Sequence, residues 1–334
     1  MKILFYDIKE IELDYLLEKI KNKIEPYFFN ISLNENTFIH EKYLNCEALS
    51  VFVSSNLNEK VLSKFKNLKY IFLRCVGYSN VDLKFCKKNN IKVYNTPNYG
   101  NSTVAEYVFS LLLNVSKKIN DSRKAISTGE INSQNLMGIE LCEKTMGIIG
   151  LGAIGRKVMN IAHGFNMEVL AYDTNPIGAY NFVSLEELLK KSDFISINCP
   201  LTPKTKNLIN RETLSLMKKS AILINCARGE IVNTRDLYEA LVNKKLQGAG
   251  LDVIECEELL CENYKNCVIN ENFRKNCLKK FFFIQKLLQL PNVIITPHNA
   301  YNTKEAQYRI LRTTLLNIQT TFDTNSSAKN LVLI

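Results

Sequence analysis

The chain has 334 residues, of which 46% are hydrophobic and 23% charged, as in globular proteins and unlike disordered ones. This length is sufficient for two domains with separate cores. The 43 basic and 33 acidic residues give a net charge of +10, but the lysines are spread along predicted helices without clustered stacking aromatics, so we expect no nucleic-acid partner.

Strand-like and helix-like segments alternate from the start of the chain, which predicts parallel sheets with helices on both faces. The first apolar run, Lys2 to Tyr6, is too short for a signal peptide and predicts an edge strand that starts such a sheet. Further elements of this first set are predicted over 10–23 (helix), 48–53, 59–65 (helix), 70–73 and 91–94. No apolar stretch approaches a membrane span, so we expect a cytoplasmic protein without a membrane partner.

A long apolar helix is predicted over 103–118, where Val104, Val108, Leu111 and Val115 recur at helical spacing. This helix follows one set of strands and precedes another. We therefore expect it to connect two domains, and its apolar surroundings would suit a contact between two copies of the chain.

The second set opens with a strand, a glycine-rich turn and a helix. Gly150, Gly152 and Gly155 follow the strand 145–149, and Asp173 comes directly after the next strand, 168–172. The first glycine permits a tight turn, the second lets the backbone approach a pyrophosphate, and the third allows close packing of helix on strand. The Asp173 carboxylate would bind ribose hydroxyls and repel a 2′-phosphate, which indicates NAD rather than NADP.

The rest of the second set predicts a fold with two domains. Strands are expected over 194–198, 221–225, 248–253 and 293–296, followed by a helix over 304–322 that returns to the first domain. We predict an α/β protein with two Rossmann-like or flavodoxin-like parallel-sheet domains and a cleft between them. Residues 1–100 and 300–334 would form a discontinuous domain, and 101–299 a dinucleotide-binding one.

Two segments have less specific patterns. The residues 259–290, with the run Lys279–Phe283, predict a helix and a loop on the active-site side, with the phenylalanines in the core. The ten cysteines include Cys142, Cys199 and Cys226 in core-like segments, so buried reduced thiols are favoured over disulfides. A cluster of Cys256, Cys261, Cys267 and Cys277 contains no C-x-x-C pair, so we expect no metal site.

Six motifs together resemble those of the D-isomer-specific 2-hydroxyacid dehydrogenases, most closely the D-lactate dehydrogenase branch. They are NYGNSTVAE at 98–106, GLGAIG at 150–155, CPLT at 199–202, NCARG at 225–229, GLDV at 250–253 and TPHNAY at 296–301. The resemblance covers nearly the whole chain. It implies the formate/glycerate dehydrogenase type of fold, with a smaller substrate domain, a larger NAD domain and a homodimer.

The same resemblance implies that Arg228, Glu257 and His298 form the catalytic set. Reduction of a 2-oxo acid needs a clamp for the carboxylate and an acid for the carbonyl oxygen. An arginine fork suits the first, a histidine the second, and a carboxylate on the other ring nitrogen orients the histidine. Each residue alone also has a purely structural interpretation. Arg228 could be a surface arginine, Glu257 one of several acids in its loop, and His298 a histidine whose hydrogen bonds are made within the protein.

Glu257 competes with Glu255 and Glu258, which lie in the same loop. In the family the catalytic glutamate lies five positions after the aspartate of the Leu-Asp motif. Counting from Asp252 selects Glu257. Glu258 stands where family members often carry proline.

Binding residues follow from the resemblance in the same way. Val76 and Gly77 would present backbone N–H groups to the substrate carboxylate, and Tyr99 and Tyr301 would line the pocket around its side chain. The residues expected to contact NAD are Gly150, Gly152, Ala153, Ile154, Gly155, Asp173, Cys199, Pro200, Thr205, Cys226, Ala227 and Asp252. Asn198 stands where many relatives have histidine, a departure on the cofactor wall.

We therefore expect an NAD-dependent dehydrogenase that interconverts a small 2-oxo acid and a D-2-hydroxy acid. Pyruvate and D-lactate are the preferred pair, because two tyrosines suit a short apolar side chain and no further arginine cluster would hold a phosphate. Two alternatives stay open: a bulkier branched or aromatic 2-oxo acid, and a non-catalytic NAD-sensing regulator on the same fold.

Overall fold

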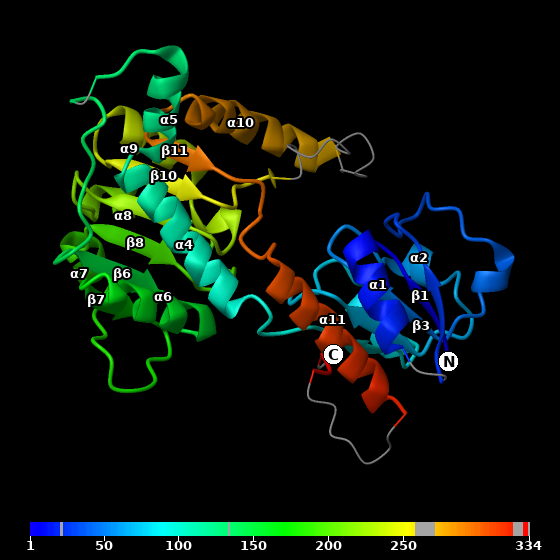
Figure 1. Cartoon of the computed structure of the whole chain (residues 1–334). Helices are drawn as coiled ribbons and strands as arrows, with labels where there is room; N and C mark the ends of the chain where they lie inside the picture. The colour runs from blue at the N-terminus through cyan, green and yellow to red at the C-terminus, as the bar shows by residue number, and fades with distance from the viewer. Residues whose placement is uncertain (21–22, 133, 258–270, 323–329, 333–334) are drawn as a thin grey trace. The chain divides into compact units, whose positions relative to one another are not determined.

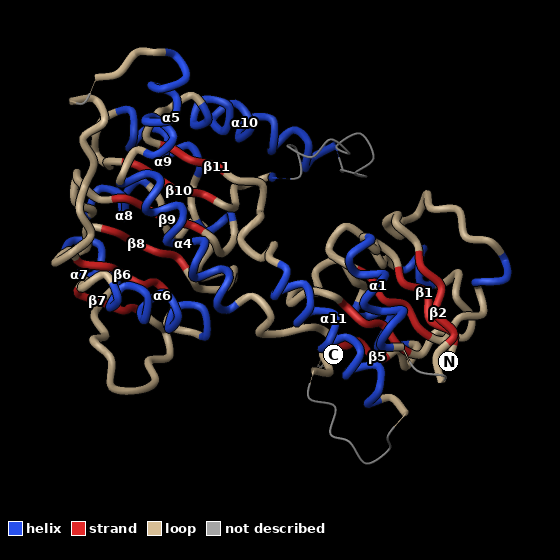
Figure 2. The backbone as a smooth tube through the Cα atoms, viewed as in Figure 1, coloured by secondary structure: helices blue, strands red, loops and turns tan. Residues whose placement is uncertain are grey.

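The computed structural model describes residues 1–20, 23–132, 134–257, 271–322 and 330–332, excluding the side chains of 271–276. They form two compact units, one of Met1–Tyr99 with Asn302–Ile334 and one of Gly100–Tyr301. Each unit is a parallel sheet between helices (Figures 1 and 2).

The first unit contains five parallel strands in the order β2-β1-β3-β4-β5. These strands are β1 (Lys2–Phe5), β2 (Glu25–Phe28), β3 (Ala48–Val51), β4 (Tyr70–Leu73) and β5 (Lys92–Tyr94). The helices are α1 (Glu10–Lys19), α2 (Glu59–Leu62), α3 (Leu83–Lys88) and α11 (Lys304–Thr320), with a 3-10 turn at Glu41–Tyr43. This strand order is that of flavodoxin-like folds.

Successive side chains of the first sheet enter opposite cores, because strand side chains alternate between faces. Phe5 and Phe72 pack with Leu16 of α1 and with α11 on one face. Leu4 packs with α2 on the other. Both faces are buried, which explains the continuous apolar runs in the sequence.

The expected edge position of β1 is wrong, because β1 lies between β2 and β3. The edge is taken by β2, which sequence inspection missed. Its four residues, Glu25-Pro-Tyr-Phe28, include a proline, and none is fully buried. Proline is tolerated in an edge strand, where one row of N–H groups has no partner, but it weakens the strand signal in the sequence.

The second unit contains six parallel strands in the order β11-β10-β9-β8-β6-β7. These strands are β6 (Thr145–Ile149), β7 (Glu168–Tyr172), β8 (Phe194–Ile197), β9 (Ile222–Asn225), β10 (Gly248–Leu251) and β11 (Val293–Ile295). The helices are α4 (Asn101–Ser116), α5 (Ile119–Thr128), α6 (Ala153–Gly164), α7 (Leu185–Lys191), α8 (Arg211–Leu216), α9 (Thr234–Val242) and α10 (Glu271–Leu288), with a 3-10 turn at Gly229–Ile231.

The direction of strand addition reverses between β6 and β8, because the chain passes from β6 to β7 and then returns to the other side of β6. Ligands of open α/β sheets bind outside the carboxyl ends of the strands at such a switch point. Helices α4 and α6 cover one face of this sheet (Figure 1), and Leu112 and Val158 lie in the core beneath them. Leu214 of α8, Leu237 of α9 and Ile284 of α10 lie in the opposite core.

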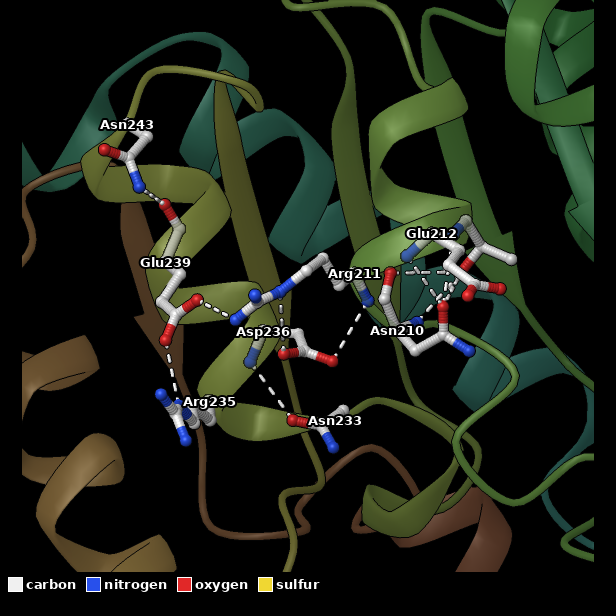
Figure 3. A network of polar contacts seen from close by, with 9 residues as sticks. Asn210, Arg211, Glu212, Asn233, Arg235, Asp236, Glu239 and Asn243 are labelled. Atoms are coloured by element: carbon white, nitrogen blue, oxygen red, sulfur yellow. Dashed lines mark hydrogen bonds and ion pairs between the residues drawn. The ribbon is translucent and has the colours of Figure 1, made fainter.

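A surface network joins α8 to α9 (Figure 3). The Arg211 backbone N–H donates to Asp236 at 3.0 Å, and its guanidinium pairs with Glu239. Glu239 also accepts from Arg235 Nε at 2.8 Å. Asn233 caps α9 by accepting from the Asp236 N–H at 3.1 Å, and this bond fixes the residue at which the helix begins.

The expected core position of the phenylalanines in 281–283 is wrong. The Phe282 side chain is 56% exposed, and Phe281 and Phe283 are partly exposed, whereas Ile284 and Leu287 of the same helix are buried. The buried face of α10 therefore contains Ile284 and Leu287 instead of the three phenylalanines. The part of the predicted helix and loop that falls on residues 259–270 lies outside the described residues.

Candidate active site

The glycine loop between β6 and α6 has one open position. Gly150 has φ +91°, and a Cβ there would lie 2.7 Å from the Cys199 backbone N. A Cβ on Gly155 would lie 2.2 Å from the Gly150 carbonyl oxygen, whereas a Cβ on Gly152 would meet nothing within 4 Å. Gly150 and Gly155 are thus required by packing, and Gly152 leaves space at the N-terminus of α6. The loop fits a dinucleotide pyrophosphate.

Asp173 connects the end of β7 to this loop. One carboxylate oxygen accepts from the Leu151 N–H at 2.8 Å and the other from the Asn175 N–H at 2.9 Å. The side chain is held beside the glycine loop and stays partly exposed. A carboxylate in this position suits the ribose hydroxyls of a dinucleotide.

Ala153 and Ile154 are the first two residues of α6, and the remaining residues expected to contact the cofactor follow neighbouring strands of the same sheet. Cys199, Pro200 and Thr205 follow β8, and Cys226 and Ala227 follow β9. Thr205 Oγ1 donates to the Pro200 carbonyl at 2.7 Å, which closes the turn. Burial raises the pKa of the Cys199 thiol to about 11, so it stays protonated and uncharged at neutral pH.

Asp252, at the end of β10, shapes the turn that carries His298. Its Oδ1 accepts from Thr296 Oγ1 at 2.6 Å and from the Asn299 N–H at 2.8 Å, and its Oδ2 from the Ala300 N–H at 2.8 Å. The Asp252 carbonyl accepts from the His298 N–H at 2.8 Å. These bonds hold His298 in the left-handed region, with φ +50°.

His298 and Glu257 form a close pair of titratable groups at this edge, with Nδ1 and Oε1 2.7 Å apart. An ionised carboxylate only accepts, so the ring carries its proton on Nδ1. The hydrogen bond to Glu257 has the largest effect and raises the pKa of His298, whereas burial of the ring lowers this pKa. The negative charges of Glu257 and Asp252 also raise the pKa, and the positive charge of Arg228 lowers it. The net direction is upward, and in the described part of the chain Nε2 makes no hydrogen bond and can face a substrate.

Arg228 lies in the adjacent loop and is exposed. Asn225 braces this loop by donating to the Arg228 carbonyl at 2.9 Å and accepting from the Ala227 N–H at 3.0 Å. A Cβ on Gly229 would lie 2.1 Å from the Ile254 carbonyl carbon, so the Arg228 loop packs backbone to backbone on the loop that leads to Glu257. The second unit therefore brings Arg228, Glu257 and His298 to one edge of its sheet.

The competing acid Glu255 has a different role. It is buried, accepts from the Thr234 N–H at 2.9 Å and pairs with Lys280 Nζ at 2.5 Å. It is therefore Glu257 that pairs with His298, and Glu255 ties the loop to α9 and α10. Glu258 lies outside the described residues.

Three of the predicted substrate residues lie in the first unit. Val76 is exposed in the loop after β4 beside Gly77, and its carbonyl accepts from Asn95 Nδ2 at 2.8 Å. Arg309 Nε donates to the Tyr99 carbonyl at 2.7 Å. Tyr301 ends the second unit. The role of these four residues stays a prediction.

Sequence inspection missed Arg74, which precedes the Val76 loop and is fully buried. Its guanidinium donates to the Tyr6 carbonyl at 2.6 Å and to the Asp7 carbonyl at 3.0 Å, and lies 3.6 Å from Glu12. The available signal was a cation directly after the apolar run Tyr70–Leu73, because a charge there needs either solvent or built-in partners.

The expectation of reduced buried thiols is wrong in two places. Cys256 and Cys277 form a disulfide, and Cys142 is exposed. The bond forms because α10 brings a cysteine back to the loop that carries Glu257. Cys261 and Cys267 of the same cluster lie outside the described residues. No helix in the described part of the chain has the length and apolarity needed to cross a membrane.

Comparisons with known proteins identify the family. Residues 109–300 match the model of the D-isomer specific 2-hydroxyacid dehydrogenase, NAD binding domain. The chain is 33% identical to the D-lactate dehydrogenase of Escherichia coli over 328 residues, which cover 95% of this chain and 96% of that protein.

Solved structures agree. The structure of Aquifex aeolicus D-lactate dehydrogenase complexed with NAD and lactic acid superposes with a TM-score of 0.83 at 33% identity, covering 99% of this chain and 98% of that one. A D-2-hydroxyisocaproate dehydrogenase gives 0.86 at 27% identity, covering 99% of both chains. With the glycine loop and Asp173 positioned for NAD, the chain belongs to the D-isomer-specific 2-hydroxyacid dehydrogenase family and is an NAD-dependent oxidoreductase.

Proposed function

We propose that this enzyme interconverts pyruvate and D-lactate. The observation that carries the proposal is the Glu257–His298 pair, at 2.7 Å, beside the exposed Arg228 at the sheet edge that bears the glycine loop. The D-lactate dehydrogenases of Escherichia coli and Aquifex aeolicus support the choice of substrate. Bound NADH supplies the hydride that the carbonyl carbon of a 2-oxo acid receives.

The chain's own residues supply the anion clamp and the proton. The Arg228 fork binds the substrate carboxylate and polarises the neighbouring carbonyl. Since Glu257 occupies Nδ1, His298 donates the proton to the carbonyl oxygen from Nε2. Glu257 fixes the tautomer and stabilises the imidazolium, which raises the pKa of His298 and keeps the acid form to higher pH than in an unpaired histidine.

The remaining binding roles are part of the same proposal. Backbone N–H groups of Val76 and Gly77 assist in holding the carboxylate, and Tyr99 and Tyr301 line the side-chain pocket. Asp252 contacts the nicotinamide end of the cofactor in addition to shaping the His298 turn. We also propose that the enzyme is a homodimer and that it is located in the cytoplasm. Analytical ultracentrifugation checks the oligomeric state.

A second candidate substrate is a branched 2-oxo acid, because the D-2-hydroxyisocaproate dehydrogenase structure superposes with a TM-score of 0.86. The two candidates share the carboxylate clamp and the proton donor. They differ only in the volume required around the substrate side chain.

The test is NADH oxidation with pyruvate, 4-methyl-2-oxopentanoate and phenylpyruvate, with chiral analysis of the product. We expect pyruvate to give the highest kcat/KM and the product to be D-lactate. A higher kcat/KM with 4-methyl-2-oxopentanoate would replace pyruvate by a branched substrate. Absence of NADH oxidation with every 2-oxo acid would contradict the proposed function.

A further inference from the structure

Three consecutive residues, Glu255, Cys256 and Glu257, are each anchored to a different partner. The Glu255 carboxylate binds the Thr234 N–H and Lys280 Nζ, Cys256 is bonded to Cys277, and Glu257 contacts His298. Two of these partners, Cys277 and Lys280, lie about one turn apart on α10. Helix α10 thus holds the loop directly before the catalytic carboxylate.

Helix α10 is itself a fixed support. Ile284 and Leu287 are fully buried in the same core as Leu237 of α9 and Ala249 of β10. Cys277 is also buried, with 2% of its surface exposed. A displacement of the 255–257 loop away from α10 would therefore have to break both the disulfide and the Glu255–Lys280 ion pair, since the helix cannot follow without opening the core.

The backbone at Cys256 needs such support. Cys256 has φ +56°, a left-handed conformation that non-glycine residues adopt at an energetic cost and that persists only where surrounding contacts maintain it. The anchors of Glu255 and Cys256 supply these contacts. Without the disulfide we expect the backbone at Cys256, the residue before Glu257, to leave the left-handed conformation.

Glu257 has little support of its own. One carboxylate oxygen contacts His298, and the other is buried without a hydrogen-bond partner among the described residues. The position of the carboxylate is therefore set by its backbone. Among the described residues, the charged groups that act on the pKa of His298 are Glu257, Asp252 and Arg228.

We propose, on the basis of the proposed function, that Cys256 and Cys277 are positioning residues: their disulfide holds the Glu257 carboxylate on His298, and reduction by a dithiol releases it and weakens proton transfer. In the reduction, a dithiol thiolate attacks the Cys256 sulfur, which belongs to the more exposed residue, and Cys277 leaves as a thiolate that takes up a proton. The second thiol of the reagent resolves the mixed disulfide. Two electrons and two protons end on the two cysteines, and the reagent becomes a cyclic disulfide.

The site makes activity responsive to the thiol redox state of the surroundings. Disulfides in reducing compartments are broken unless their bonds resist exchange, and such cysteine pairs act there as redox sensors. Here the pair lies next to a residue of the proton path. The expected consequence of reduction is a loss of the Glu257–His298 contact, with the NAD-binding loop unchanged.

The first experiment follows the pKa of His298 directly, since the chain contains only three histidines, His40, His163 and His298. Histidine-labelled protein is titrated by NMR as isolated, after dithiothreitol treatment, and as the Cys277→Ser variant. We expect the pKa of His298 to fall by roughly half a unit or more when the bond is absent, while His40 and His163 keep theirs. Cys142→Ser, which removes an exposed free thiol, is the matched control and should give the parent's values.

The second experiment measures kcat/KM for pyruvate reduction against pH in the same samples. The alkaline limb should move to lower pH on reduction, the KM for NADH should stay within about twofold, and Cys277→Ser should not respond further to dithiothreitol. Should Cys277→Ser fail to fold, the reduced parent carries the test. Peptide mapping that finds Cys256 and Cys277 unlinked, or a His298 pKa that does not change on reduction, would overturn the inference. A shifted pKa in a protein inactive on every 2-oxo acid would instead contradict the proposed function and leave this inference standing.

Discussion

The two units share one architecture but use the carboxyl ends of their strands differently. In the first unit the strand-end cation Arg74 is buried and donates to two backbone carbonyls beside Glu12. In the second unit the strand-end cation Arg228 is exposed, and the nearby His298 binds a single carboxylate. The same fold therefore builds a structural centre at one sheet and the proposed chemical centre at the other, and the difference lies in which polar groups are left available.

The largest expected effect in the chemical centre is that of His298→Ala. Loss of the proton donor should lower kcat/KM for pyruvate by about a thousandfold. Fluorescence titration should show NADH binding near that of the parent, because the glycine loop and Asp173 are unchanged. Substantial pyruvate turnover without His298 would show that another group donates the proton.

Replacing each of the two strand-end arginines by methionine distinguishes the two centres, because one variant should lose activity and the other stability. Arg228→Met removes the carboxylate clamp and should lower kcat/KM for pyruvate by about a hundredfold, with unchanged urea unfolding. Arg74→Met leaves buried acceptors unpaired and should lower the free energy of unfolding by roughly 3 kcal/mol. Stability losses of equal size in both variants would contradict the distinction.

Substitutions of Asp173 test its role in the preference for NADH over NADPH. Asp173→Ala removes the ribose contacts and the repulsion of a 2′-phosphate, so we expect the preference for NADH over NADPH to narrow by about tenfold. Asp173→Asn keeps an acceptor for the Leu151 N–H and separates the loss of charge from damage to the loop. Equal kcat/KM with NADH and NADPH in the parent would remove the basis for this role.

The sequence predicted features that depend on local motifs and left out those that depend on packing between distant segments. The glycine loop and the choice of Glu257 follow from short fixed spacings, and the structure gives Gly150, Gly155 and Glu257 the expected surroundings. The burial of Arg74 depends on Glu12 and on the carbonyls of Tyr6 and Asp7, which follow β1 and lie far from Arg74 in the sequence. The Cys256–Cys277 bond likewise depends on where α10 packs.

The most direct test of the central claim, that Glu257 and His298 act as one proton-donating pair, is the pH dependence of kcat/KM for pyruvate reduction in the parent and in Glu257→Gln. The pKa of His298 is raised, first by the hydrogen bond to Glu257, so the ring stays protonated to higher pH and reduction persists there. Glutamine keeps the shape and removes the charge. The account predicts an alkaline limb shifted to lower pH by roughly one unit, with NADH binding unchanged. A limb at the same pH in both proteins would contradict it.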